Sequence, residues 1–186
     1  MAANARLTAT VAAVLLALLA VEGVTVLRVR SLLTLHVFIG TLLVPPVVLK
    51  IGSTGYRFVR YYAGSPAYRR KGPPPPAPRV LGPLVVVLTL TLLASGIALL
   101  FTGPGLRGQL LLVHRASFIL WVVVMTVHVS GHLGETARLA PRDFYWRTRN
   151  QVAGAGTRNW VLATSHVLGA PLAVVMVGRD GHFLAG

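Results

Sequence analysis

The sequence predicts an all-α integral membrane protein, a helical bundle with five transmembrane helices. The composition is 54% hydrophobic, and only 12% of the residues are charged, against about 25% in a typical soluble domain. The mean hydropathy is +0.70. Five spans of about 20 residues each fill most of a chain of 186 residues and leave short loops. A separate soluble catalytic domain is therefore excluded, and any chemistry must lie within the spans or come from a partner.

Five apolar segments, each near the length that a bilayer demands, account for the predicted helices. They cover residues 8–27, 32–52, 80–102, 110–133 and 159–178. The apolar run of the first is too long for a signal peptide and no A-x-A cleavage site follows it, so we expect a retained span. The second contains Pro45 and Pro46, which predict a kink that either serves helix packing or lines a quinone pocket.

The charge distribution predicts the orientation. The chain has 18 Lys and Arg residues against 4 Asp and Glu, a net charge of +14. The basic residues gather in two connections, 53–79 and 134–158, and basic loops face the cytoplasm. We therefore expect a cytoplasmic N-terminus and an external tail, 179–186, in a bacterial-type inner or plasma membrane. The first loop contains GPPPPAP at 72–78, which predicts a polyproline II spacer.

The composition also excludes several kinds of partner and site. A basic excess in a soluble protein would indicate nucleic acid, but no motif or aromatic platform accompanies the basic residues here, so no nucleic acid is expected. The chain contains no Cys. Disulfides, Cys-ligated zinc and iron–sulfur clusters are therefore excluded.

Histidines within the apolar segments are the main chemical signal, because an ionisable residue at membrane depth is costly and by default indicates a functional site. His36 lies in the second segment, His114 and His128 lie in the fourth, and His166 lies in the fifth. On a helix, the spacing of His114 and His128 places them within about 40° of each other and about 21 Å apart along the axis. By depth the four residues form an outer layer, His36 with His114, and an inner layer, His128 with His166. His182, in the polar tail, is expected at the surface.

Two bis-histidine sites stacked across a bilayer are what a di-haem electron conduit requires. A lone metal ion usually needs carboxylates or thiols as well, and none is available at these depths. We therefore predict two haem groups, with the four histidines as axial iron ligands, in a four-helix core formed by residues 31–178. Residues 1–30 form a separate first helix. His132, one turn after His128 on the same face, is an alternative inner ligand, or it reaches a propionate, a quinone or solvent.

Cationic side chains near each layer are candidate partners for haem propionates, because arginine pairs with carboxylates in a bidentate geometry. They are Arg28, Arg30 and Arg115 near the outer pair, and Arg138 or Arg158 near the inner pair. The alternative for Arg115 is that it snorkels to the interface.

Two small residues and a lysine complete the candidate set. Gly40 follows His36 by four residues and Gly169 follows His166 by three, so each leaves a gap on the ligand's own face where a flat macrocycle fits. Glycine also serves ordinary helix packing in membranes. Lys50, near the inner end of the second segment, either snorkels or binds a quinone oxygen or a propionate.

The segment LLVHRASFILWVVVMTVHVSGHL, with its H-x13-H spacing, resembles the fourth helix of a known group of proteins. These are the di-haem cytochrome b membrane subunits of respiratory formate dehydrogenases and nickel–iron hydrogenases, and related small bacterial cytochromes b. The resemblance covers about residues 32–178. It implies a compact bundle that holds two haems b and passes electrons to or from a quinone or a docked subunit.

The expected function is electron transfer across the bilayer, between a quinol pool or partner protein and an acceptor on the other face, in an oxidoreductase or electron-transfer subunit. No G-x-G-x-x-G motif is present, so nicotinamide oxidation would need a partner chain. The expected partners are membrane lipid and, as open alternatives, a quinone or a redox subunit docked on the basic loops. The competing hypothesis is a haem-free protein that uses its histidines for proton or metal passage, or a structural anchor subunit. Glu22 is the only acidic residue within the spans, which disfavours transport.

Overall fold

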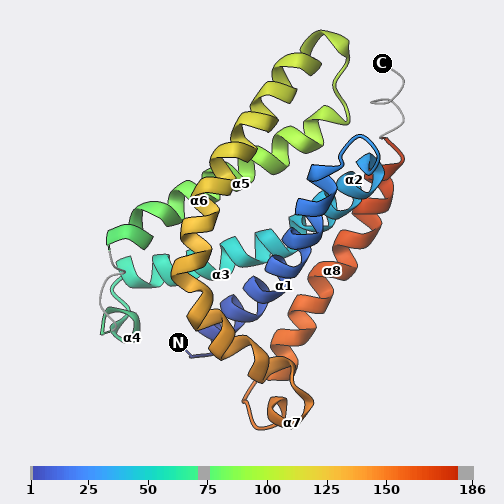
Figure 1. Ribbon diagram of the computed structural model, residues 1–186. Coiled ribbons are helices and arrows are strands. Elements are labelled where there is room, and N and C mark those ends of the chain that lie inside the picture. The colour runs from blue at the N-terminus through green and yellow to red at the C-terminus, as the bar shows by residue number, and fades with distance from the viewer. Residues whose placement is uncertain (1, 71–75, 180–186) are drawn as a thin grey trace.

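The structure is a computed structural model that describes residues 2–70 and 76–179. Every regular element in these ranges is a helix (Figure 1). The long helices are α1 (Ala2–Leu27), α2 (Leu33–Leu42), α3 (Val44–Tyr62), α5 (Pro76–Leu99), α6 (Pro104–Phe144) and α8 (Ala155–Val177), and the short ones are α4 (Pro66–Arg69) and α7 (Trp146–Arg149). The all-α prediction is confirmed for this part of the chain.

Five stretches of helix are long and apolar enough to cross a membrane, as predicted. They are Ala3–Leu27, Leu33–Tyr62, Arg79–Leu99, Pro104–Phe144 and Ala155–Val177. The helices extend beyond the apolar segments into both basic connections, to Tyr62 in α3 and to Phe144 in α6. A polar side chain does not by itself end a helix. In α6 the extension contains Glu, Ala, Arg and Leu, all strong helix formers.

The proline-rich connection differs in part from its expected conformation. Because α5 begins at Pro76, residues 76–78 are helical and not polyproline II. Proline is tolerated there because the first turn of a helix needs no backbone donor. Residues 72–75 of that segment, and the tail beyond Arg179 with His182, lie outside the described residues.

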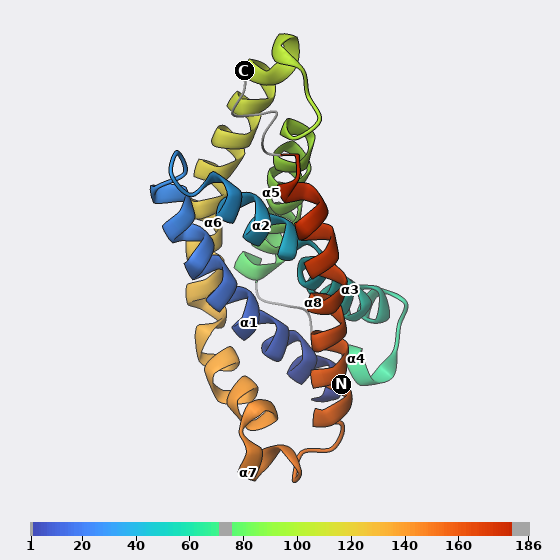
Figure 2. The same cartoon turned by 90° about the vertical axis from the view of Figure 1, so that its right-hand side faces the viewer.

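The helices form two groups that meet along α1. The group of α1, α2, α3 and α8 encloses the apolar core, which consists of Val11, Leu15, Ile39, Leu43 and Leu162. The other group is a hairpin in which α5 packs mainly along α6, and α6 also packs against α1. Figure 2 shows α6 and α8 as the two long uprights of the molecule, with α1 between them. The first helix is therefore part of the central packing.

The second span bends at its proline pair. Helix α2 ends at Leu42 and α3 begins at Val44, with the prolines in the first turn of α3. Gly169 of α8 packs into this bend: a Cβ added to it would lie 3.1 Å from the Leu42 carbonyl oxygen and 3.4 Å from Cδ of Pro45. This contact favours the packing explanation of the kink over the quinone pocket.

Candidate functional site

The outer layer brings His36 of α2 and His114 of α6 together from different groups of helices. Their ring centroids are 6.3 Å apart and the ring planes are inclined by 77°. Two imidazoles that bind one metal from opposite sides, with metal–nitrogen bonds of about 2 Å, place their centroids about 6 Å apart. The centroid separation of the two rings is therefore close to that of such a pair.

The Nδ1 nitrogen of His36 is held by a carboxylate from α1. It lies 2.8 Å from Oε1 of Glu22 and 3.2 Å from the hydroxyl of Thr25. That hydroxyl is 2.9 Å from Oε2 of Glu22, and the Thr25 side chain is fully buried. Because a carboxylate only accepts hydrogen bonds, Nδ1 carries a proton, and Nε2 is the ring nitrogen that remains for a ligand.

His114 has a comparable arrangement on α5. Its Nδ1 lies 3.1 Å from the carbonyl oxygen of Leu92 and 3.1 Å from the hydroxyl of Ser95. The ring rests on Gly96, where an added Cβ would lie 3.0 Å from Cε1 of His114. Since the carbonyl accepts a hydrogen bond from Nδ1, Nε2 is again the ring nitrogen that remains for a ligand. Metal-binding histidines almost always donate their other ring N–H to a carboxylate or carbonyl in this way.

The inner layer contains His128 and His132 of α6 and His166 of α8. The rings of His128 and His132 are in contact, with centroids 4.7 Å apart. Nδ1 of His166 lies 2.9 Å from the Leu162 carbonyl oxygen, which leaves Nε2 as its lone-pair nitrogen. Within the described ranges no ring contact joins His128 to His166, and their pairing stays a prediction.

Two nitrogens of this layer are orphaned. Nδ1 of His128 and Nε2 of His166 are buried and have no hydrogen-bond partner in the part of the chain that the structure describes. Buried polar atoms without a partner are costly and rare. A bound group that takes an imidazole nitrogen would remove this cost.

Lys50 of α3 is the cationic group of the inner layer. Its Nζ donates a hydrogen bond to the Thr8 carbonyl oxygen of α1, at 2.8 Å, and it interacts electrostatically with His128 and Glu135. Lys50 follows His36 at the same interval at which His128 follows His114. The amine is therefore half-buried and hydrogen-bonded to the backbone of a neighbouring helix.

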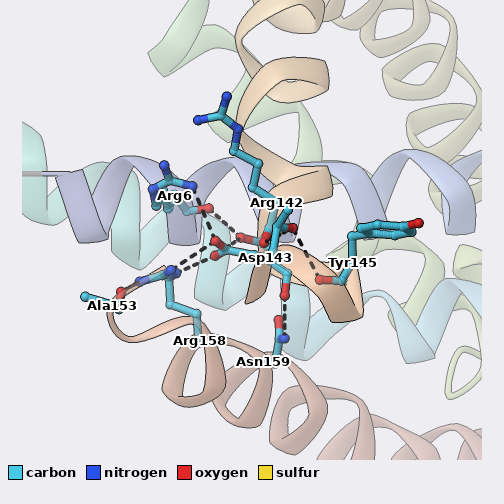
Figure 3. Close-up of polar contacts among 9 residues, drawn as sticks. Arg6, Arg142, Asp143, Tyr145, Ala153, Arg158 and Asn159 are labelled. Atoms are coloured by element: carbon cyan, nitrogen blue, oxygen red, sulfur yellow. Dashed lines mark hydrogen bonds and ion pairs between the residues drawn. The ribbon is translucent and has the colours of Figure 1, made fainter. Parts of the chain in front are cut away.

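Arg158 is used differently from its predicted role. It is 6% exposed, and its Nε and Nη2 donate to Oδ2 and Oδ1 of Asp143 at 2.5 and 3.0 Å. Figure 3 shows Arg158 and Arg6 converging on this carboxylate, with Arg6 at 3.5 Å. Asn159 donates to the Asp143 backbone oxygen at 2.9 Å. This cluster joins α1, α6 and α8, so the guanidinium of Arg158 is already paired with a carboxylate of the chain.

The remaining predicted residues have different surroundings. Arg30 and Arg115 are exposed and keep their guanidinium groups at the surface near the outer layer. Gly40 faces Glu22, since an added Cβ would lie 3.3 Å from Oε1. The space beside Gly40 therefore accommodates the carboxylate that holds His36. The space at Gly169 is filled by Leu42 and Pro45.

Four residues of the site were missed by sequence reasoning as partners: Glu22, Thr25, Ser95 and Asp143. The signal for Glu22 was visible, because a lone acid in an apolar span needs a partner. The small hydroxyl residues gave no signal, since serine and threonine are common at helix contacts in membranes. Among the described residues, no group of three or more His, Asp or Glu side chains is arranged to hold a metal ion. The clearest arrangement is the pair of imidazoles of His36 and His114, in which Nδ1 of each ring contacts a protein oxygen.

Comparison of the chain with protein-family models, with curated proteins and with solved structures found no match.

Proposed function

We propose that the protein is a membrane-bound di-haem cytochrome b that transfers electrons across the bilayer, between a quinol pool or partner protein and an acceptor on the other side. The observation that carries the proposal is the outer histidine pair. His36 and His114 come from helices far apart in the sequence, lie at a centroid separation close to that of two imidazoles on one metal atom, and each direct Nδ1 to an acceptor.

The donor set fits haem iron better than a bare metal ion. A haem needs two axial imidazoles and supplies its four equatorial nitrogens itself, whereas zinc or copper sites need three or four protein ligands. The unpartnered Nε2 of His166 supports a second site in the inner layer, at about 21 Å from the first along α6.

In this proposal the protein holds the two haems, orients them and separates them from water. A bound haem supplies reversible one-electron chemistry. His36 and His114 hold the outer group, and His128 with His166 hold the inner group in the predicted pairing. Between the layers Trp121 of α6 donates a hydrogen bond to Thr89 of α5, at 2.8 Å, and so keeps its ring in a fixed position between the two sites.

Membrane orientation and partners follow from the charges. The connection around α7 and the one around α4 carry the basic excess, so both are assigned to the cytoplasm, where they attract anionic lipid or an acidic redox partner. Arg30 and Arg115, which are exposed near the outer layer, are the candidate partners for the propionates of the outer haem. Lys50 is the candidate donor to a propionate or quinone oxygen on the inner side.

The test is a reduced-minus-oxidised visible spectrum of the detergent-purified protein from haem-replete cells, with haem quantified as the pyridine haemochrome. We expect two haems b per chain. His36→Ala and His114→Ala should each reduce this to about one, because they remove the same haem, and the double variant should lose no more than either single variant.

The inner layer is tested in the same way. His128→Ala and His166→Ala should each remove the other haem, while His132→Ala should keep both; loss of a haem in His132→Ala alone would make His132 the inner ligand. His182→Ala, beyond the last span, is the matched control and should keep two haems. A colourless wild-type protein would refute the proposal and favour the haem-free alternative.

A further inference from the structure

Glu22 is the acidic side chain of the first apolar helix, and a hydroxyl, an imidazole and the space beside a glycine surround its carboxylate. Its side chain is only 13% exposed. The hydroxyl of the fully buried Thr25 lies 2.9 Å from Oε2, and the absence of a side chain at Gly40 leaves room for Oε1. Among the described residues, the ion-pair partner of Glu22 is His36. The negative charge is therefore directed at one imidazole.

The histidines differ in what Nδ1 donates to. His36 donates to a carboxylate, whereas His114 and His166 donate to backbone carbonyls. A carboxylate acceptor draws the Nδ1 proton more strongly and makes Nε2 a more basic ligand. A more basic axial ligand stabilises ferric over ferrous iron and lowers the reduction potential, since axial ligation and second-shell hydrogen bonds set that potential.

We propose that Glu22 is a positioning residue, a role that rests on the proposed function: its hydrogen bond fixes the His36 ring for axial binding and holds the reduction potential of the outer haem below that of the inner haem. The asymmetry gives the conduit a direction. An electron shared by the two sites resides on the inner layer, so transfer from the outer face toward the inner face is downhill.

The experiment is a redox titration of the detergent-purified full chain, wild type against Glu22→Gln, with haem content measured on the same samples. The amide keeps the shape of the side chain and removes its charge. We expect the lower of the two midpoint potentials to rise by about 59 mV, which corresponds to a tenfold change in the ferric-to-ferrous ratio for one electron. The higher potential should not move.

Two further variants keep the test decisive. Thr25→Val removes the hydroxyl beside Oε2 and leaves the carboxylate, so a smaller rise of the same potential is expected. Glu135→Gln makes the same chemical change on α6, far from His36, and should leave the lower potential unchanged. Electron paramagnetic resonance of the oxidised protein gives an independent readout, because loss of a fixed ring orientation alters the low-spin ferric signal of the outer haem.

The outcomes separate the two proposals. If the wild-type protein binds no haem, the proposed function fails. If two haems are present and Glu22→Gln moves neither potential, or shifts the lower potential no more than Glu135→Gln does, the role of Glu22 is refuted and the cytochrome assignment stands. If Glu22→Gln loses one haem while Glu135→Gln keeps both, the positioning role is supported, and Thr25→Val then decides the effect on potential.

Discussion

The ion pair between Asp143 and Arg158 yields the sharpest stability prediction. Asp143 has no exposed side-chain surface and Arg158 is 6% exposed, and two N–H groups of the guanidinium donate to the two carboxylate oxygens. Asp143→Ala leaves a buried guanidinium whose remaining hydrogen-bond partner among the described residues is the Ala153 carbonyl oxygen. Breaking a buried pair by removal of one partner costs about 3–5 kcal/mol. We expect a loss of that size in the free energy of unfolding.

A matched control comes from Arg6, which contacts the same carboxylate. Its side chain is 20% exposed and its distance to Oδ1 is 3.5 Å, so Arg6→Gln should cost no more than about 1 kcal/mol. The double variant Asp143→Leu, Arg158→Met should recover most of the loss, because apolar replacement of a whole buried pair is often neutral or stabilising. Unfolding in mixed micelles titrated with a denaturing detergent, followed by circular dichroism, measures all three. If Asp143→Ala costs no more than Arg6→Gln, the buried pair does not hold these helices together.

Three further predictions test the packing and the orientation. Gly169→Leu should destabilise the fold by about 1–3 kcal/mol through overpacking, because an added Cβ already lies 3.1 Å from atoms of α2. Gly156→Leu is the control and should not destabilise the fold, since nothing lies within 4 Å of a Cβ there. The same unfolding assay compares the two variants. Trp121→Phe should cost about 0.6–1.7 kcal/mol, the range for hydrogen bonds between membrane helices, through loss of the bond to Thr89, and Thr89→Val should cost a similar amount. Since the chain has no native cysteine, a membrane-impermeant thiol reagent should label Gly105→Cys in intact cells and Arg149→Cys only after permeabilisation; the reverse pattern would invert the proposed orientation.

The five spans were predictable because a bilayer requires a long apolar run and each run is visible in the sequence. Helix ends were less predictable, since hydropathy reports burial in lipid and not helix formation. The continuation of α6 to Phe144 lies in a charged segment that hydropathy cannot assign.

The position of each histidine within its apolar segment suggested that His36 and His114 lie in one layer, and their rings are 6.3 Å apart in the structure. Depth says nothing about rotation of a helix around its axis or about neighbours. The bend after Leu42 changes the direction of the second span, so the surroundings of Lys50 could not be derived from an ideal helix. The charge and position of Arg158 suggested a propionate partner, but its pairing with Asp143 depends on how α6 and α8 approach each other, which the sequence does not reveal.

Two carboxylates, Glu22 and Asp143, explain why α1 matters although it carries no predicted ligand. Glu22, near one end of α1, holds His36. Near the other end, Arg6 and Thr10 both approach Asp143 at 3.5 Å, where α6 and α8 are joined. Between them, Val11 and Leu15 lie in the apolar core. Helix α1 thus contacts His36 near one end and joins α6 and α8, the helices that carry His114 and His166, near the other. In the proposed site, α1 therefore helps to set the positions of the candidate ligands and is more than a separate anchor.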